Sequence, residues 1–391
     1  MSVKTFAAID VGSFELTMKI FDLSGKNTMR EIDCIRQRID LGSDTYAHGK
    51  ISNEKIDDLC HTLKEFAQIM ESYKVTAYKA YGTSAIRETE NTLILQDQIE
   101  QRTGIWVETL SNSEQRFLDY KSIASKGETF RRIIEEKTAI LDIGGGSIQI
   151  SLFDKDALVT TQNIRMGSLR IRERLAGIQS ETEHYEEMVE ELIWNEVSSF
   201  KKMYLKDRKI ENIMLIGDVF TDSVYQNIEE KTTKIISREN FNTWYEKIIR
   251  QSPMELAVKL GIPLENASLM YPSAVIYKCL IDMMGAEHIW IPGVHMTRGI
   301  AYEYAEQMKL LKGGHNFEND ILMAAKNIGK RYAVNRPHVQ NLEMTALAMF
   351  DATKKMHGMK ERERLLLQMA VMLHDVGKYI SFNNVADSSY N

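Results

Sequence analysis

The chain has 391 residues, more than one compact core usually holds, so two or three domains are expected. Hydrophobic residues make up 43% of the sequence and charged residues 27%, the balance of a globular protein and not of a disordered or membrane-embedded one. The formal net charge of −6 argues against wholesale binding of nucleic acid, so no specific nucleic-acid partner is expected.

The first predicted elements are a strand, a tight turn and a second strand over residues 6–23. In the second strand Leu16, Met18 and Ile20 alternate with polar residues, which is the period of a half-buried strand. The elements predicted to follow are a helix over 51–73, a short strand over 76–82, a helix from 87, a short strand over 105–110 and a helix from 113.

The opening pattern returns over residues 138–153, again as strand, glycine-serine turn and strand. The first turn, 10–13, reads DVGS, and the second, 142–147, reads DIGGGS. A repeat of domain length predicts two duplicated domains that face each other. The elements predicted after it are a helix over 181–202, a strand over 212–216 that ends in Gly217-Asp218, and helices through 304.

The character of the sequence changes near residue 311. The stretch 312–316 (KGGHN) predicts a linker, and the periodicity beyond it is helical, including 339–356 and 361–374. We therefore expect three domains, with boundaries at 1–124, 125–310 and 311–391. The chain stops in a polar run soon after a helix, so the last domain is expected to be truncated.

The two glycine-serine turns are candidate phosphate-binding loops. Glycine lets backbone N–H groups approach an anion without a Cβ in the way, and serine adds a hydroxyl donor. The aspartates that end the preceding strands, Asp10 and Asp142, suit a hydrated Mg²⁺ beside phosphate oxygens. One such loop alone would be explained as well by an ordinary hairpin turn, but a matched pair favours phosphate. A dinucleotide fingerprint does not fit, because the residues after Ser147 alternate as a strand and do not open a helix.

Five segments, in the same order along the chain, carry a family resemblance. They read YGTSAIRETEN (81–91), LSNSEQRFLDY (110–120), LDIGGGSIQI (141–150), MGSLRIRERL (166–175) and LHDVGKYIS (373–381). The first four are similar to the motifs ATSALRDAxN, ISGxEEAxxxY, DIGGGSTEL and LGxVRLTERF of the exopolyphosphatase/guanosine-pentaphosphate phosphatase (Ppx/GppA) family. The fifth is similar to that family's helical C-terminal domain. The family belongs to the actin–hexokinase–Hsp70 superfamily.

The resemblance implies an α/β fold of two actin-like (ribonuclease H-like) domains with a cleft between them, followed by an all-helical, HD-like domain. It also implies hydrolysis, with Mg²⁺, of the terminal phosphate of linear polyphosphate or guanosine pentaphosphate. Carried over residue by residue, it assigns Asp10 and Asp142 to the metal. The residues it assigns to phosphate are Gly12, Ser13, Ser84, Arg87, Gly144, Gly145, Gly146 and Ser147.

Two positions depart from the family motifs in the same direction. The second glutamate of the E-E pair is Gln115 here, and the glutamate of GGGSTE is Gln149. Glutamine orients water but accepts no proton at neutral pH, and loss of a general base typically costs about 10²–10⁴-fold in rate. In one reading the chain is a hydrolase that recruits Glu114 or Glu15 to activate water. In the other it is a catalytically weakened, regulatory protein that binds polyphosphate or (p)ppGpp. A sugar or acetate kinase is disfavoured, because the matching segments are those of the phosphatase family.

Two further clusters remain open to more than one interpretation. Arg165, Arg170, Arg172 and Arg174 could follow a polyphosphate chain or form a solvated face with local ion pairs. His374-Asp375 resembles the metal-binding dyad of HD-type phosphohydrolases, and His338 is the only aligned earlier histidine. Since no convincing fourth ligand follows, the structural interpretation is favoured, as a brace at a helix end.

Location and assembly are predicted from weaker signals. The N-terminus lacks a signal peptide, and no stretch approaches the roughly 18 uninterrupted apolar residues of a membrane span. The three cysteines lack metal-ligand spacing, which fits a reducing cytoplasm. The helical C-terminal region is expected to pair two chains in a homodimer.

Overall fold

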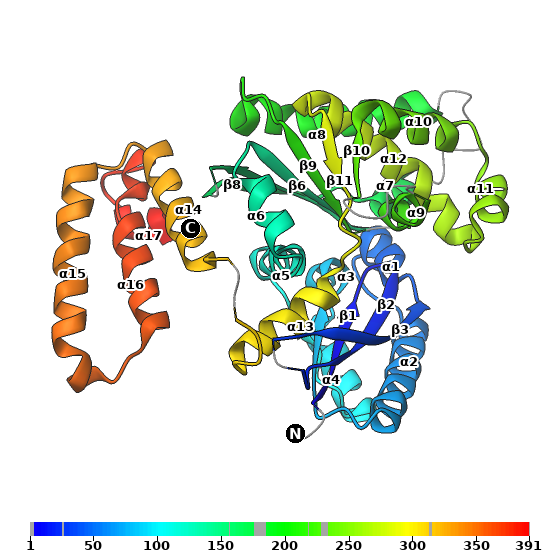
Figure 1. The fold of residues 1–391 in the computed structure, drawn as a ribbon, viewed down its shortest axis with the longest axis horizontal. Coiled ribbons are helices and arrows are strands. Elements are labelled where there is room, and N and C mark those ends of the chain that lie inside the picture. Colours follow the sequence, from blue (N-terminus) through cyan, green and yellow to red (C-terminus); the bar gives the residue numbers. More distant parts are fainter. Residues whose placement is uncertain are drawn as a thin grey trace. The chain divides into compact units, whose positions relative to one another are not determined.

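The computed structural model describes residues 4–25, 27–155, 157–175, 185–217, 219–227, 234–312 and 315–390. Three sequence predictions fall partly outside these ranges: Asp218 at a strand end, the two linker glycines 313 and 314, and the first turn of the helix expected over 181–202. The chain forms two compact units, Met1–Ser151 with Gln162–Gly314, and Leu152–Thr161 with His315–Asn391 (Figure 1).

The first unit contains two sheets. The first sheet has the strand order β3-β2-β1-β4-β5, in which β1 pairs antiparallel with β2 and parallel with β4. Its strands are β1 (Thr5–Val11), β2 (Glu15–Asp22), β3 (Arg30–Arg38), β4 (Ala77–Gly82) and β5 (Glu108–Thr109). The predicted strand over 105–110 is therefore shorter than expected, and β3 was not predicted.

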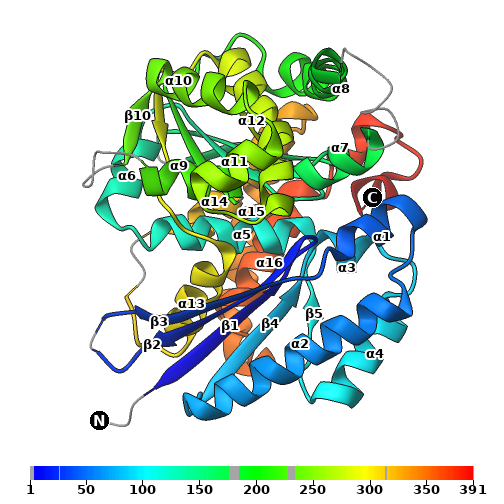
Figure 2. The same ribbon diagram turned by 90° about the vertical axis from the view of Figure 1, so that its right-hand side faces the viewer.

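Both faces of this sheet are covered, which the alternation along β1 explains. Ala7, Ile9 and Val11 point into the core shared with α2 (Asn53–Ser72) and α4 (Thr92–Thr103). Phe6 and Ala8 point the other way, into a cluster with α13 (Met296–Gln307). Figure 2 shows α2 and α4 on one side of the sheet and α13 on the other. With both faces buried, the strand sequence is apolar at nearly every position.

The second sheet repeats the arrangement around its own central strand. Its order is β10-β11-β9-β6-β7-β8, and β6 lies between β7 and the parallel strand β9 as β1 lies between β2 and the parallel strand β4. Each central strand has an aspartate, Asp10 or Asp142, as its penultimate residue, before a glycine turn. The strands are β6 (Thr138–Ile143), β7 (Ile148–Asp154), β8 (Ala157–Ile164), β9 (Asn212–Ile216), β10 (Ile235–Ser237) and β11 (His288–Trp290).

Further helices complete the first unit, and α5 (Asn112–Ala124) and α13 pack closely against each other. A Cβ at Gly299 of α13 would overlap the backbone carbonyl of Leu118 on α5, so only glycine permits this approach. One predicted helix from 87 is in fact two short helices, α3 and α4. The others are α1 (Leu41–His48), α3 (Ser84–Glu88), α6 (Glu128–Ile134), α7 (Ser168–Leu175), α8 (Tyr185–Phe200), α9 (Val219–Asn227), α10 (Arg238–Ile249), α11 (Pro253–Leu260) and α12 (Leu264–Met284), with a π-helical turn at Lys201–Leu205.

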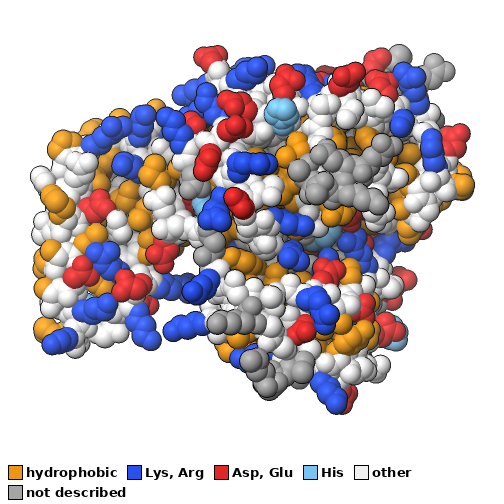
Figure 3. All heavy atoms as spheres, viewed as in Figure 1, with side chains coloured by type: hydrophobic (Ala, Val, Ile, Leu, Met, Phe, Trp, Pro, Cys, Tyr) orange, Lys and Arg blue, Asp and Glu red, His pale blue; other side chains and the backbone are white. Residues whose placement is uncertain are grey.

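In its described residues the second unit is helical apart from the end of β7 and the start of β8. Its helices α15 and α16 confirm the predictions over 339–356 and 361–374, and its compact core includes Ala325, Val339 and Met372. Apolar side chains such as Met344, Met349 and Leu366 are exposed, and Figure 3 shows hydrophobic side chains at the surface between charged ones. The helices are α14 (Phe317–Arg331), α15 (Arg336–His357), α16 (Glu361–Leu373), a 3₁₀ turn at Val376–Tyr379 and α17 (Val385–Tyr390).

Two mixed sheets with covering helices, followed by a helical region, are the predicted fold class, which is thereby confirmed. None of the helices in the described part of the chain has both the length and the hydropathy to cross a membrane.

Candidate functional site

A cavity of about 150 Å³ lies where the turns after β1 and β6 meet. Residues from both sheets form its wall, so the two halves of the repeat contribute to one site. Helix α5 adds Gln115 and Asp119. The predicted site residues that line the cavity are Asp10, Gly12, Ser13, Ser84, Gln115, Asp142, Gly144, Gly145, Gly146 and Ser147.

The two glycine-serine turns close in the same way. The Gly12 N–H donates to the Glu15 carbonyl at 3.1 Å, and the Gly144 N–H donates to the Ser147 carbonyl at 3.0 Å. A Cβ at Gly12 would stand 2.7 Å from the Glu15 oxygen, which is closer than side chains tolerate. Glycine at this position is therefore required by the turn itself, whatever the turn binds.

A tyrosine that the sequence did not single out joins the two turns. The Tyr46 hydroxyl lies 2.7 Å from Ser13 Oγ and donates to Ser84 Oγ at 3.0 Å. A Cβ at Gly146 would overlap both the Tyr46 hydroxyl and Ser84 Oγ. Only glycine at 146 lets the second turn approach this hydroxyl cluster. No motif marks Tyr46, which lies in a short helix 38 positions before Ser84.

The arginine cluster on α7 forms ion pairs. Arg170 donates from Nε to the Gly146 carbonyl at 2.9 Å, pairs with Glu88 at 2.9 Å and stacks on the Tyr46 ring. Glu88 also pairs with Arg165 and accepts from Ser84 Oγ. Burial would raise the pKa of Glu88, but the two arginines outweigh it and the pKa is lowered. Arg172 pairs with Asp40 at 3.0 Å, so three of the four predicted cluster members hold carboxylates.

Three predicted residues, Arg87, Glu114 and Gln149, lie outside the cavity lining. Arg87 donates to the Leu110 carbonyl at 2.8 Å and faces Gln115 Oε1 at 3.4 Å, so it supports the chain where α5 approaches. Glu114 is exposed and closes a capping box at the start of α5, accepting from the Ser111 N–H at 2.9 Å. These hydrogen bonds lower the pKa of Glu114 and tie up its carboxylate. The geometry therefore does not support Glu114 as the base that activates water.

Gln149 is buried on β7 with 2% of its surface exposed. Within the described residues neither its Oε1 nor its Nε2 has a hydrogen-bond partner. An unpaired buried amide costs about 1–3 kcal/mol, which a bound ligand or water would recover. Gln149 is absent from the cavity wall itself, unlike Gln115.

Asp119 is the functional candidate that the sequence analysis missed. It lies four residues after Gln115 on α5, hence on the same face, and it is 5% exposed. It lines the cavity, and its Oδ2 lacks a partner among the described residues. Burial, with the neighbouring Asp142, raises the pKa of Asp119 well above its usual value. The i+4 spacing from Gln115 was a usable signal, but the family motif places no acidic residue there.

Three carboxylates thus converge at the floor of the cavity. Desolvation raises the pKa of Asp10 to about 7, with Glu15 and Asp142 adding to the effect. Desolvation likewise raises the pKa of Asp142 to about 6, although Asp119 and Arg116 oppose it. Asp10 Oδ1 has no hydrogen-bond partner in the described part of the chain. Such carboxylates stabilise a positive charge placed among them.

The cavity wall is acidic. Its described residues include five carboxylates but a single arginine, Arg36. That guanidinium pairs with Asp222 at 2.9 Å and Glu15 at 3.5 Å, and Asp222 also pairs with His295 at 3.0 Å. Burial opposes this pairing, yet His295 and Arg36 lower the pKa of Asp222 to about 2. An anionic ligand entering here needs accompanying cations.

The helical unit brings together the other residues singled out in the sequence. His338, His374 and Asp375 are neighbours there, although the sequence favoured only a helix-end brace.

Two models of known protein families match this sequence. The sequence model of the Ppx/GppA phosphatase family matches residues 20–308, and that of Ppx/GppA phosphatase domain III matches residues 322–390. A bifunctional 3-dehydroquinate synthase/phosphatase of Fusobacterium nucleatum is 22% identical over 310 residues, which cover 72% of this chain and 44% of that protein. Exopolyphosphatase 1 of Mycobacterium tuberculosis is 28% identical over 144 residues, 37% of this chain and 40% of that protein. The matched regions thus span less than half of these curated relatives.

Solved structures share the fold. The crystal structure of an exopolyphosphatase from Cytophaga hutchinsonii has a TM-score of 0.69 and 19% identity, covering 79% of this chain and all of that one. The Aquifex aeolicus Ppx/GppA family member has a TM-score of 0.63 and 16% identity, covering 78% of this chain and 99% of that one. With the family match extending over most of its length, the chain belongs to the Ppx/GppA phosphatase family.

Proposed function

We propose that this chain binds the end of a linear phosphoanhydride in the cavity and transfers its terminal phosphate to water with the help of Mg²⁺. The substrates proposed are inorganic polyphosphate and guanosine pentaphosphate, which present the same terminal groups. The observation that carries the proposal is the meeting of two matched glycine-serine turns above a floor of three carboxylates. Family membership and the exopolyphosphatase names of the relatives support it.

The residues present fit a magnesium ion. Asp10 and Asp142 would hold it, since both offer carboxylate oxygens, the ligands that Mg²⁺ prefers, and Asp10 Oδ1 is unpaired. The acidic wall also explains why a phosphate chain would need a cation to enter. When bound, the ion would neutralise negative charge on the phosphate oxygens.

The chain's own residues would bind and orient the substrate. Ser13 and Ser147 offer hydroxyl donors where the two turns meet, whereas Ser84 would have to release Glu88 before it could donate to a phosphate. Gln115, through its amide, would orient the attacking water. The new bond joins the water oxygen to the terminal phosphorus while the bridging P–O bond breaks, which releases phosphate and a chain one unit shorter.

The proton of the attacking water needs an acceptor. Gln115 accepts none, Glu114 lies outside the cavity, and Glu15, which lines it, is paired with Arg36 at 3.5 Å, so we assign this role to Asp119, one helical turn from Gln115. It is the cavity-lining carboxylate on the same helix face as Gln115.

A second candidate function is binding without turnover. Gln115 and Gln149 are neutral where the family motifs have glutamates, and the Tyr46 hydroxyl already occupies the space between the two turns. Both features favour a regulatory protein that holds a polyphosphate chain and releases it unchanged.

Hydrolysis and binding without turnover are distinguished by measuring phosphate release and ligand affinity on the same protein. The purified chain is incubated with polyphosphate or guanosine pentaphosphate and Mg²⁺, and its affinity for each is measured by calorimetry. Release that disappears in Asp142→Asn supports hydrolysis, whereas tight binding with release no greater than a blank supports the regulatory protein. Absence of both would refute the proposed site.

A homodimer and a cytoplasmic location stay predictions. Light scattering on the purified chain tests the first, and fractionation of cells tests the second.

A further inference from the structure

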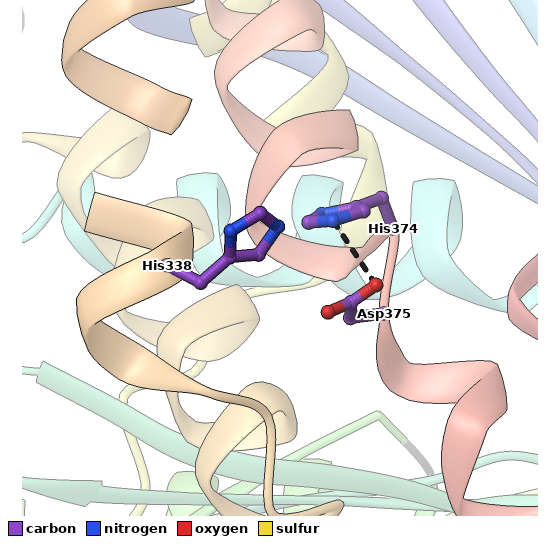
Figure 4. Close-up of side chains that lie close together, drawn as sticks. All are labelled: His338, His374 and Asp375. Carbon is purple, nitrogen blue, oxygen red and sulfur yellow. Dashed lines mark ion pairs between the residues drawn. The ribbon is translucent and has the colours of Figure 1, made fainter. Parts of the chain in front are cut away.

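The helical unit holds a cluster of three potential metal ligands. His338 lies in the first turn of α15, His374 ends α16, and Asp375 follows it. Figure 4 shows the three side chains pointing toward one another. One ligand atom from each lies within 4.8 Å of the other two, and no other group of three His, Cys, Asp or Glu side chains in the described ranges is so close.

The hydrogen bonds of His374 fix which nitrogen faces the cluster. Its Nδ1 lies 2.7 Å from the Val371 carbonyl, and since a carbonyl only accepts, Nδ1 carries the hydrogen. The other nitrogen, Nε2, faces Asp375 Oδ1 at 3.1 Å. A histidine that donates one N–H to a backbone carbonyl and turns its other nitrogen outward has the arrangement usual for a metal ligand.

The geometry of that contact suits a cation. With the hydrogen on Nδ1, His374 Nε2 and Asp375 Oδ1 both present lone pairs, and their 3.1 Å separation is that of two ligand atoms on one ion. The His338 ring lies with its centroid 5.5 Å from that of His374 and supplies a further nitrogen. Asp375 is 6% exposed, whereas His338 is exposed, which leaves a path for an ion from solvent.

We propose that His338, His374 and Asp375 bind one divalent transition-metal ion. Two imidazoles and one carboxylate suit zinc and the ions that resemble it, such as cobalt. Ligand bonds of about 2.0–2.2 Å place ligand atoms about 3–4 Å apart, so small side-chain rotations complete the site. With three protein ligands, a coordination position remains for water or an anion.

The ion would join the start of α15 to the end of α16. The apolar core between these helices and α14 is limited. Its buried residues include Ala325, Val339 and Met372, and the hydrophobic residues packed against them are only partly buried. Because a metal that binds only the folded form adds its binding free energy to stability, the ion would stabilise this unit. This inference lies outside the phosphate-binding cavity and does not depend on the proposed function.

Lys378 would compete with the ion for the Asp375 carboxylate. Its Nζ lies 2.7 Å from Asp375 Oδ2, and its side chain is 45% exposed. The lysine therefore neutralises one oxygen of the ligand carboxylate and can move away into solvent. Removing its charge is expected to tighten metal binding, which a purely structural brace does not predict.

The test uses Co²⁺ as a spectroscopic probe on the full chain after dialysis against chelator. Visible absorption bands are expected to grow to one ion per chain and to be displaced by Zn²⁺. Removal of even an outer-shell partner typically costs 10–100-fold in affinity, so His338→Gln and His374→Gln are each expected to weaken Co²⁺ binding by at least about tenfold. Lys378→Gln is expected to strengthen it several-fold, and Zn²⁺ is expected to raise the melting temperature of the wild type but not of His338→Gln.

A control variant keeps the result specific. His61→Gln replaces an exposed histidine on α2, outside the cluster, and should keep the cobalt signal. Circular dichroism establishes that each variant is folded. Wild-type chain without cobalt bands, or His338→Gln with unchanged affinity, overturns the proposal.

Discussion

Asp119 lies one helical turn after Gln115 on α5, and both side chains line the cavity between the two glycine-serine turns. The chain thus has an amide where the family motif has a glutamate and a carboxylate four residues further on. The cavity therefore keeps a carboxylate on this helix face although position 115 is an amide.

We expect Asp119→Asn to lower phosphate release by about 10²–10⁴-fold, because the substitution removes the proposed proton acceptor and keeps the shape of the side chain. Gln115→Glu should restore part of the activity in the Asp119→Asn background. Initial rates with polyphosphate and Mg²⁺ measure both effects. Asp97→Asn, an exposed carboxylate on α4, is the matched control, and wild-type rates in Asp119→Asn would contradict the assignment.

Asp10 is expected to reduce stability at high pH when no cation is bound. Its pKa is about 7 in the folded chain against 3.8 for the free group, so between these values the folded form binds more protons than the unfolded form. The free energy of unfolding therefore falls as pH rises through this window. Asp10→Asn should raise it at pH 8 by on the order of 1–3 kcal/mol and change it little at pH 4.

Chemical denaturation at the two pH values measures this effect. Adding Mg²⁺ at pH 8 should stabilise the wild type more than Asp10→Asn, because the ion replaces the missing positive charge. Equal gains from Mg²⁺ in both proteins would argue against Asp10 as a ligand.

Gly146→Ala is expected to destabilise the chain by about 1–3 kcal/mol, because the new Cβ would overlap the Tyr46 hydroxyl and Ser84 Oγ. Tyr46→Phe removes the first of these atoms, so the double variant should recover part of the loss. Thermal unfolding of the two single variants and the double variant gives the coupling free energy between positions 46 and 146. If the stability losses of the two single variants are strictly additive in the double variant, the contact between position 146 and the Tyr46 hydroxyl is absent in solution.

Glu114→Ala is expected to cost about 0.5–2 kcal/mol of stability through loss of the capping box and to leave phosphate release unchanged. Denaturation midpoints and initial rates test the two parts separately. A large fall in the rate of phosphate release, without loss of stability, would show that Glu114 takes part in catalysis.

The sequence was sufficient to predict the fold because the fold depends on local patterns. The duplicated strand–turn–strand motif around Asp10 and Asp142 is contiguous in each copy, and the apolar alternation of β1 reflects burial of both its faces. Helix boundaries were less accurate, since the break between α3 and α4 at 89–91 depends on hydrogen bonds of Thr89 and Asn91 to residues 49–51, some 40 positions earlier.

The site was predictable only where a motif marked it. Tyr46 contacts Ser13 and Ser84 through folding alone, so no spacing could reveal it. Asp119 was overlooked because the comparison with family motifs directed attention to the positions that had changed, and not to a position that the motif leaves unspecified. Glu114 was one of two candidates for water activation, with Glu15, and since adjacent residues on a helix point about 100° apart it does not share the cavity-facing side of Gln115.

The hydroxyls of Tyr46, Ser13 and Ser84 are already bonded to one another in the free protein. Tyr46 donates its one hydroxyl hydrogen to Ser84 Oγ, so the 2.7 Å contact places the Ser13 hydrogen on the tyrosine oxygen, and Ser84 in turn donates to Glu88. Under the proposed function a phosphate oxygen would take the Ser13 hydrogen in place of the tyrosine oxygen, so ligand entry would exchange one hydrogen bond for another and would not add one. The affinity gained at this serine would then be the difference between a charged acceptor and a neutral one, which favours anions over neutral hydroxyl compounds.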